Sequence, residues 1–159
     1  DHQEFKSELF STQAFTEMMI ELDTAGDKRT LIVPTSANSM HELMNAGANY
    51  LTKSDLSIIG KESWKDLVPG SSLQKNCWNG GINMGKDLDR AWIRIGLVTD
   101  NSPENTGGIC PTPNSYIGIG GKNDEIPTLD LSVGNYGKGH GNYEDGEKSI
   151  ASFGYVFIR

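Results

Sequence analysis

Glycine is distributed unevenly along this 159-residue chain, and the asymmetry limits what each part can fold into. Four of the 19 glycines lie in residues 1–70, whereas fifteen lie in residues 71–159. Glycine weakens helix interiors and is common in the turns that join strands. We therefore expect a single domain over 1–159, with a mainly helical part at 1–70 and an antiparallel β part with long loops at 71–159.

The first part carries helical periodicity. Over residues 5–22, apolar residues recur at spacings of mostly three, four or seven residues. This pattern predicts an amphipathic helix that ends near Gly26. We expect this helix to bury one stripe against the sheet. A short extended run follows at 31–33, and further helices are predicted from a capping box at Ser39 and Glu42 and over 62–68. The expected stripe consists of Phe5, Leu9, Met19 and Leu22.

Alternating apolar residues predict strands in the second part, at 91–99 and 116–121. Gly118 and Gly120 leave one face of the second strand without side chains, where we expect the first helix or a ligand to approach. A last strand at 150–158 is apolar on both faces, so it is predicted to be central. The expected fold class is α+β, with an N-terminal amphipathic helix and short helices packed on a Gly-rich antiparallel β-sheet.

The charge lies mostly in the long loops of the second part. Residues 100–147 hold eight acids and two bases, which is −6 of the net charge of −7. This balance opposes a surface that tracks phosphates, so nucleic acid is not an expected partner. Calcium could use such carboxylates, but no EF-hand pattern is present and solvated acidic turns are favoured. The three histidines lack zinc-site spacing, so no metal and no cofactor are predicted.

Two cysteines, Cys77 and Cys110, are too few for a disulfide scaffold but sufficient for one bridge. Two buried thiols in a cytosolic protein would look the same in sequence. We predict the disulfide, which is typical of an oxidising compartment. The sequence begins at Asp1, which fits either processing after export or a trimmed chain, and no apolar run is long enough for a membrane span. The expected location is extracellular or at the cell surface.

One constellation could support catalysis. Cys77 is followed by Trp78, and His140 and Asn142 lie downstream, which are the residue types of a thiol hydrolase. The residues around Cys77 do not match that class, however, and His140 lies in a Gly-Lys-Gly-His-Gly string that cannot hold a base in place. We predict that the chain is not an enzyme and has no catalytic residues, with a cysteine hydrolase that uses Cys77 and His140 as the alternative.

Aromatic and polar residues are interleaved in the loop at 134–149. Sugars stack their apolar face on aromatic rings and pair their hydroxyls with amides and carboxylates, so these residue types suit a glycan. Hydrophobic plugs at the end of a sheet are the other interpretation of the tyrosines. Because neither tyrosine belongs to a predicted core strand, we expect both to be dispensable for folding. The predicted ligand-binding residues are Tyr136, His140, Asn142, Tyr143 and Asp145.

The order of these features resembles the soluble part of a type IV pilin or minor pilin that lacks its N-terminal membrane helix. The resemblance rests on the predicted helix at 5–22, on Pro34-Thr35-Ser36 leading to Leu43 and 46–47, and on a Gly-rich β region with a cysteine pair. It implies an exported filament subunit that packs against other subunits through the N-terminal helix and binds a surface receptor or glycan through its loops. A purely structural subunit without a ligand is the alternative.

Overall fold

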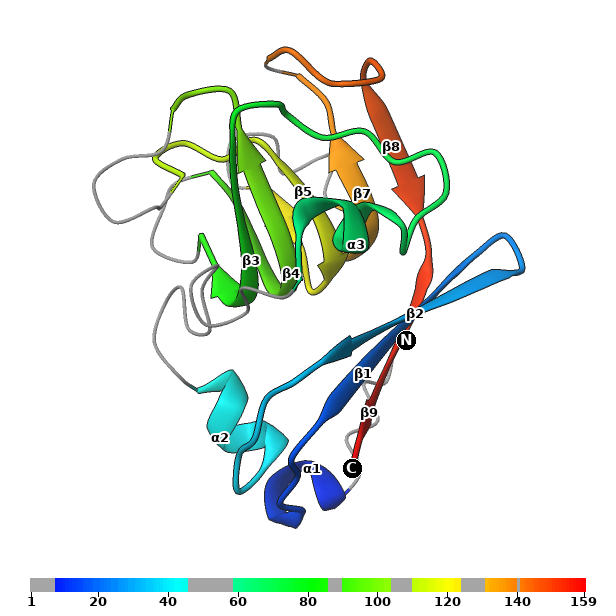
Figure 1. Ribbon diagram of the computed structural model, residues 1–159, viewed down its shortest axis with the longest axis vertical. Coiled ribbons are helices and arrows are strands. Elements are labelled where there is room, and N and C mark those ends of the chain that lie inside the picture. The colour runs from blue at the N-terminus through cyan, green and yellow to red at the C-terminus, as the bar shows by residue number, and fades with distance from the viewer. Residues whose placement is uncertain (1–7, 46–58, 86–89, 104–109, 124–130, 140) are drawn as a thin grey trace.

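The computed structural model describes residues 8–45, 59–85, 90–103, 110–123, 131–139 and 141–159. Within them the chain forms short helices and two antiparallel sheets (Figure 1). The helices are α1 (Leu9–Thr12), α2 (Met40–Met44) and α3 (Lys61–Lys65). The strands are β1 (Met18–Thr24), β2 (Asp27–Val33), β3 (Cys77–Met84), β4 (Ala91–Asp100), β5 (Ser115–Ile119), β6 (Lys122–Asn123), β7 (Val133–Gly137), β8 (Lys148–Ala151) and β9 (Phe153–Ile158).

The small sheet has the order β2-β1-β9. Ala25 and Gly26 join β1 to β2 in a two-residue hairpin, and both have positive φ, as a primed turn requires. Met18, Ile20 and Leu22 alternate along β1 and are fully buried, so they form the inner face of this sheet.

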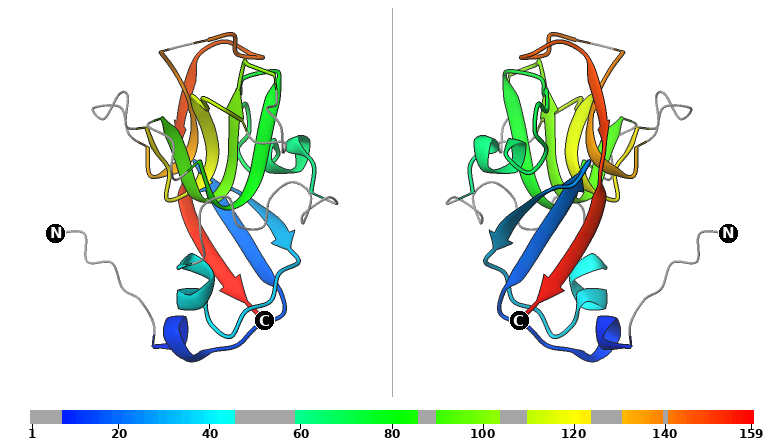
Figure 2. Two further views of the ribbon diagram at one scale, coloured as in Figure 1. Left: turned by 90° about the vertical axis from the view of Figure 1, so that its left-hand side faces the viewer. Right: turned by 90° about the vertical axis from the view of Figure 1, so that its right-hand side faces the viewer.

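The large sheet has the order β3-β4-β5-β7-β8, and the short β6 pairs with the start of β4. Figure 2 shows the small sheet extending beyond one end of the large sheet, with α3 alongside the large sheet. The main core lies between the two sheets and under α3, whose Trp64 is fully buried. A second buried cluster occupies the other face of the large sheet and consists of Met84, Ala91, Ile93, Val98, Tyr116 and Tyr136.

The expected N-terminal helix is wrong. Of the described residues in this stretch, 8–22, only Leu9–Thr12 is helical. Met18–Thr24 forms β1, so the fold is mostly β, and the described residues of the part at 1–70 are not mainly helical. β1 pairs with β2 on one side and with β9 on the other. Because of this pairing, its residues adopt the two-residue alternation of a strand instead of the predicted helix. Leu9 is exposed rather than part of a buried stripe, and Phe5 lies outside the described residues.

The last predicted strand exists, but it is not central. Ser152 divides it into β8, at one edge of the large sheet, and β9, at one edge of the small sheet. At this crossing Ser152 donates its N–H to the carbonyl of Val133 at 3.1 Å, and its hydroxyl hydrogen-bonds that of Thr24 at 2.7 Å. Apolar character on both faces of β9 therefore marks one half-buried face, with Val156 and Ile158 packed against the core, and one exposed face.

The glycine face of β5 does not receive the first helix. Gly118 pairs with Gly96 of β4, and a Cβ on Gly118 would lie 2.2 Å from the carbonyl oxygen of Ile95. The close approach is therefore between neighbouring strands.

The prediction of a helix from the capping box is confirmed by α2, since the side chain of Ser39 accepts the N–H of Glu42 at 3.1 Å.

Candidate binding surface

One end of the large sheet is closed by a disulfide. Cys77 begins β3 opposite Asp100 at the end of β4, and its sulfur is bonded to that of Cys110. The two Cα atoms lie 5.5 Å apart, and both cysteines are buried. The predicted disulfide is confirmed, and it is compatible with an extracellular protein. Because Cys77 carries no thiol in this state, the hydrolase alternative lacks its nucleophile.

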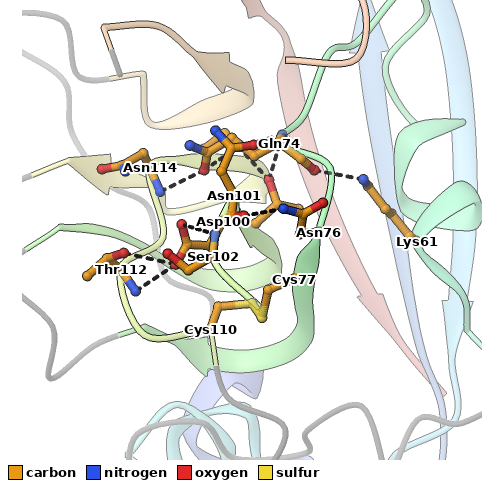
Figure 3. The surroundings of a disulfide bond; sticks show 12 residues. Lys61, Gln74, Asn76, Cys77, Asp100, Asn101, Ser102, Cys110, Thr112 and Asn114 are labelled. Atoms are coloured by element: carbon orange, nitrogen blue, oxygen red, sulfur yellow. Dashed lines mark hydrogen bonds between the residues drawn. A yellow bond between two sulfur atoms is a disulfide. The ribbon is translucent and has the colours of Figure 1, made fainter. Parts of the chain in front are cut away.

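Asp100 fixes the loop that returns from the disulfide (Figure 3). Its carboxylate accepts the backbone N–H and the hydroxyl of Thr112, each at 2.9 Å, and the N–H of Ser102 at 3.2 Å. These donors satisfy a carboxylate that is only 2% exposed. Among the described residues, no three His, Cys, Asp or Glu side chains are grouped to hold a metal ion.

Gln74 connects three segments at the same end of the sheet. Its N–H is donated to the hydroxyls of Thr99 at 3.0 Å and Ser115 at 3.1 Å, at the ends of β4 and β5. Its side-chain oxygen accepts the N–H of Asn114 at 3.2 Å. Gln74 is 1% exposed, so the segment before β3 is anchored by buried polar contacts.

Asn101 fixes the backbone of the 141–145 loop. In the amide orientation that satisfies both of its polar atoms, it donates to the Asn142 carbonyl at 2.8 Å and accepts the Asn142 N–H at 2.6 Å. Its oxygen also accepts from Nε2 of Gln74 at 3.1 Å. Asn76 donates its amide to the carbonyl of Asn101. The exposed Asn76 and Asn142 therefore extend from backbone that is held in place.

The predicted site residues are only partly brought together. Asn142 and Asp145 are exposed at this end, and the Asp145 N–H is donated to the Ser72 hydroxyl at 3.0 Å. Tyr136 is fully buried in β7 and Tyr143 is 7% exposed, so the expectation that both tyrosines lie outside the core is wrong. His140 lies outside the described residues.

The buried tyrosines have structural partners. Tyr136 stacks on Tyr116 with ring centroids 5.2 Å apart, and Tyr143 lies beside Gly137, where a Cβ would approach its ring to 3.3 Å. These contacts support the hydrophobic plug interpretation of both side chains. In this conformation Tyr136 exposes no ring face on which a sugar could stack.

No family model, curated protein or solved structure matches this chain. The resemblance to type IV pilins therefore stays a prediction. None of the described helices is long and apolar enough to cross a membrane.

An ion-pair clamp joins α3 to the 141–145 loop. Lys61 Nζ donates to one carboxylate oxygen of Glu144 at 2.5 Å and to the carbonyl of Gln74 at 2.8 Å, and Lys65 Nζ donates to the other oxygen at 2.7 Å. The helical spacing of the two lysines is visible in the sequence. Their partner is 79 and 83 residues away along the chain, which no local pattern indicates.

This clamp makes stability depend on pH. Burial raises the pKa of the Glu144 carboxyl, but hydrogen bonds and charge from Lys61 and Lys65 outweigh burial and lower the pKa below its ordinary value of 4.5. A lowered folded-state pKa contributes stability that is present above the unfolded value. The contribution is lost as pH falls through the folded value.

We expect Glu144→Gln to lower the free energy of unfolding by about 1 to 2 kcal/mol at pH 7. The difference from wild type should begin to shrink as pH falls below about 4.5, where the unfolded-state carboxyl takes up its proton, and should vanish as pH falls through the lowered folded-state pKa. Urea denaturation at pH 7, 5 and 3 measures this. Glu62→Gln is the matched control, because the Glu62 side chain is 76% exposed and should change stability little. A pH-independent effect of Glu144→Gln would contradict the role of its charge.

Proposed function

We propose that this chain is a non-enzymatic, extracellular component of a filament or fibre that binds a surface receptor or glycan through the disulfide-closed end of its large sheet. The observation that carries the proposal is a polar surface at that end with a fixed backbone. Its exposed members are Lys75, Asn76, Asn142 and Asp145.

The chemistry of this surface suits polyhydroxylated ligands. Side-chain amides both donate and accept hydrogen bonds, and a carboxylate accepts from hydroxyl groups, so Asn76, Asn142 and Asp145 can pair with neighbouring hydroxyls of a sugar. A site whose backbone is already ordered loses less conformational entropy on binding. The disulfide and the contacts of Gln74 and Asn101 supply that order.

Recognition on this surface would be polar rather than aromatic. Tyr136 and Tyr143 are buried, so we assign them to the support of the loop and not to ligand stacking. Their burial is also the observation that favours the second candidate, a purely structural filament subunit without a ligand. A measured ligand would separate the two.

We expect the double variant Asn142→Ala, Asp145→Ala to lose at least about tenfold of its glycan or cell-surface affinity, because a binding site that hydrogen-bonds hydroxyls is left incomplete. Glycan-array and cell-binding assays measure this, and both substitutions lie on exposed side chains that should leave thermal stability nearly unchanged. Asn38→Ala, on an exposed asparagine beside α2, is the matched control. Undiminished binding by the folded double variant would remove this site, and no binding by wild type would favour the structural subunit.

A further inference from the structure

The exposed face of β9 is unusually apolar. Phe153, Tyr155 and Phe157 are 73%, 48% and 47% exposed. They account for three of the five exposed large hydrophobic residues in the described parts of the chain. Ile32 lies in the same surface, because Met19 of β1 pairs with both Ile32 and Phe157. Patches of this kind in a folded protein mark interaction surfaces.

β9 also lacks the features that protect edge strands. Proteins usually place charges or proline on such strands to prevent pairing with another chain. The opposite edge of the small sheet follows that rule, since β2 begins with Asp27, Lys28 and Arg29. β9 has the sequence Phe-Gly-Tyr-Val-Phe-Ile, with no charge and no proline. The unprotected edge is therefore β9, which Figure 2 shows at the side of the small sheet.

The ladder between β1 and β9 identifies the backbone groups at the open edge. Glu17 and Arg159 exchange both hydrogen bonds, at 3.0 and 3.2 Å, so this is a hydrogen-bonded pair. Such pairs alternate along antiparallel strands, and the odd-numbered residues of β9 therefore face β1. Gly154, Val156 and Ile158 direct their N–H and C=O groups away from β1.

We propose that a second copy of this chain pairs with β9 in antiparallel orientation, with Val156 on the two-fold axis. Val156 is the middle one of the three outward residues. Only in this register does each outward residue of one copy lie opposite an outward residue of the other copy. Gly154 then lies opposite Ile158 of the second copy, and Val156 lies opposite its own equivalent. The pairing ends before Ser152, whose N–H is already donated to Val133.

The same register matches the side chains on the exposed face. Tyr155 lies opposite Phe157 of the second copy, in a non-hydrogen-bonded position where cross-strand side chains are closest. Phe153 lies opposite Arg159, whose side chain is 82% exposed, and this places a guanidinium beside an aromatic ring. Each contact occurs twice, and no two like charges face each other across the seam.

A shallow depression lies beside the C-terminal end of β9, at one end of the proposed contact between the two copies (the dimer seam). It has a volume of about 210 Å³ and is lined by Glu17, Met19, Phe157, Ile158 and Arg159. The register brings Phe153 of the second copy, the most exposed of the three β9 aromatics, next to this depression. The pairing involves only three outward residues of each chain, and short interfaces are typical of weak complexes, so we expect a reversible dimer.

Sedimentation velocity across a concentration series tests the pairing. Val156→Pro removes an outward N–H and leaves the ladder to β1 intact, so it should weaken dimerisation at least about tenfold. Thr30→Pro is the matched control: by the same alternation its N–H points outward at the β2 edge, and the dimer should persist. A monomeric wild type at all concentrations, or a dimer unaffected by Val156→Pro, would overturn the proposal.

Cysteine trapping tests the register independently of the proline variant. Equal amounts of Tyr155→Cys and Phe157→Cys should form a covalent heterodimer on mild oxidation, because these positions face each other. Each variant alone should cross-link poorly, since Tyr155 is displaced by two residues from its own equivalent. Ile32→Cys is the control on the same exposed face. Efficient cross-linking of Ile32→Cys without the mixed heterodimer would indicate face-to-face packing and overturn the edge pairing, whatever the outcome for glycan binding.

Discussion

Replacing Trp64 with alanine is expected to lower the free energy of unfolding by about 3 to 5 kcal/mol. Trp64 of α3 is fully buried. Its ring lies over Gly80 of β3, where a Cβ would come within 2.7 Å of Nε1 of the indole. Gly80 has no side chain that could fill part of the space left by the indole. Equilibrium denaturation followed by circular dichroism measures the loss.

Phe153→Ala is the matched control for this prediction. Both substitutions remove an aromatic ring, but Phe153 is 73% exposed and should change the stability of the monomer by less than about 0.5 kcal/mol. The comparison has to be made at concentrations where the chain is monomeric, because Phe153 belongs to the proposed dimer seam. Equal losses for the two variants would contradict the placement of α3 on the large sheet.

The second large effect is expected from the disulfide. The double variant Cys77→Ser, Cys110→Ser opens a link between residues 33 positions apart, which should cost about 3 to 4 kcal/mol through the greater freedom of the unfolded chain. Reduction of the wild type should produce a similar loss. Because both sulfur atoms are joined in the disulfide, alkylation without reductant should modify neither cysteine, even in unfolded protein. Two modified thiols in native protein would contradict the bridge.

Local signals in the sequence predicted several elements correctly. The capping box at Ser39 and Glu42 starts α2, and the alternation around Ile95 and Ile117 marks β4 and β5. The disulfide partners followed from there being only two cysteines. Each of these inferences needed only neighbouring residues or a single available partner.

The errors came from contacts between distant parts of the chain. Leu22 fits a helical stripe in the sequence, but it is buried in β1 because β9 supplies a neighbour on the far side. The ion pairs of Glu144 and the two hydrogen bonds between the Asn101 side chain and the Asn142 backbone likewise join segments that no local pattern connects. The sequence indicated exposed loop residues such as Asn142 and Asp145 as a candidate surface, but the contacts that support this loop and the burial of Tyr136 were missed.

The pairing of β1 with β9 has a consequence for the order of assembly. Met18 lies opposite Ile158, so the hydrogen-bond ladder between β1 and β9 can form fully only after the last residues of the chain have been synthesised. During synthesis the β1–β2 hairpin emerges first and keeps one open side until β9 leaves the ribosome. Pairing of such distant segments is slow because a long stretch of chain must be ordered before the contact forms. We therefore expect closure of the small sheet to be the last step of folding, and a chain released before residue 153 to keep the β9-facing edge of β1 open to chaperones and to aggregation.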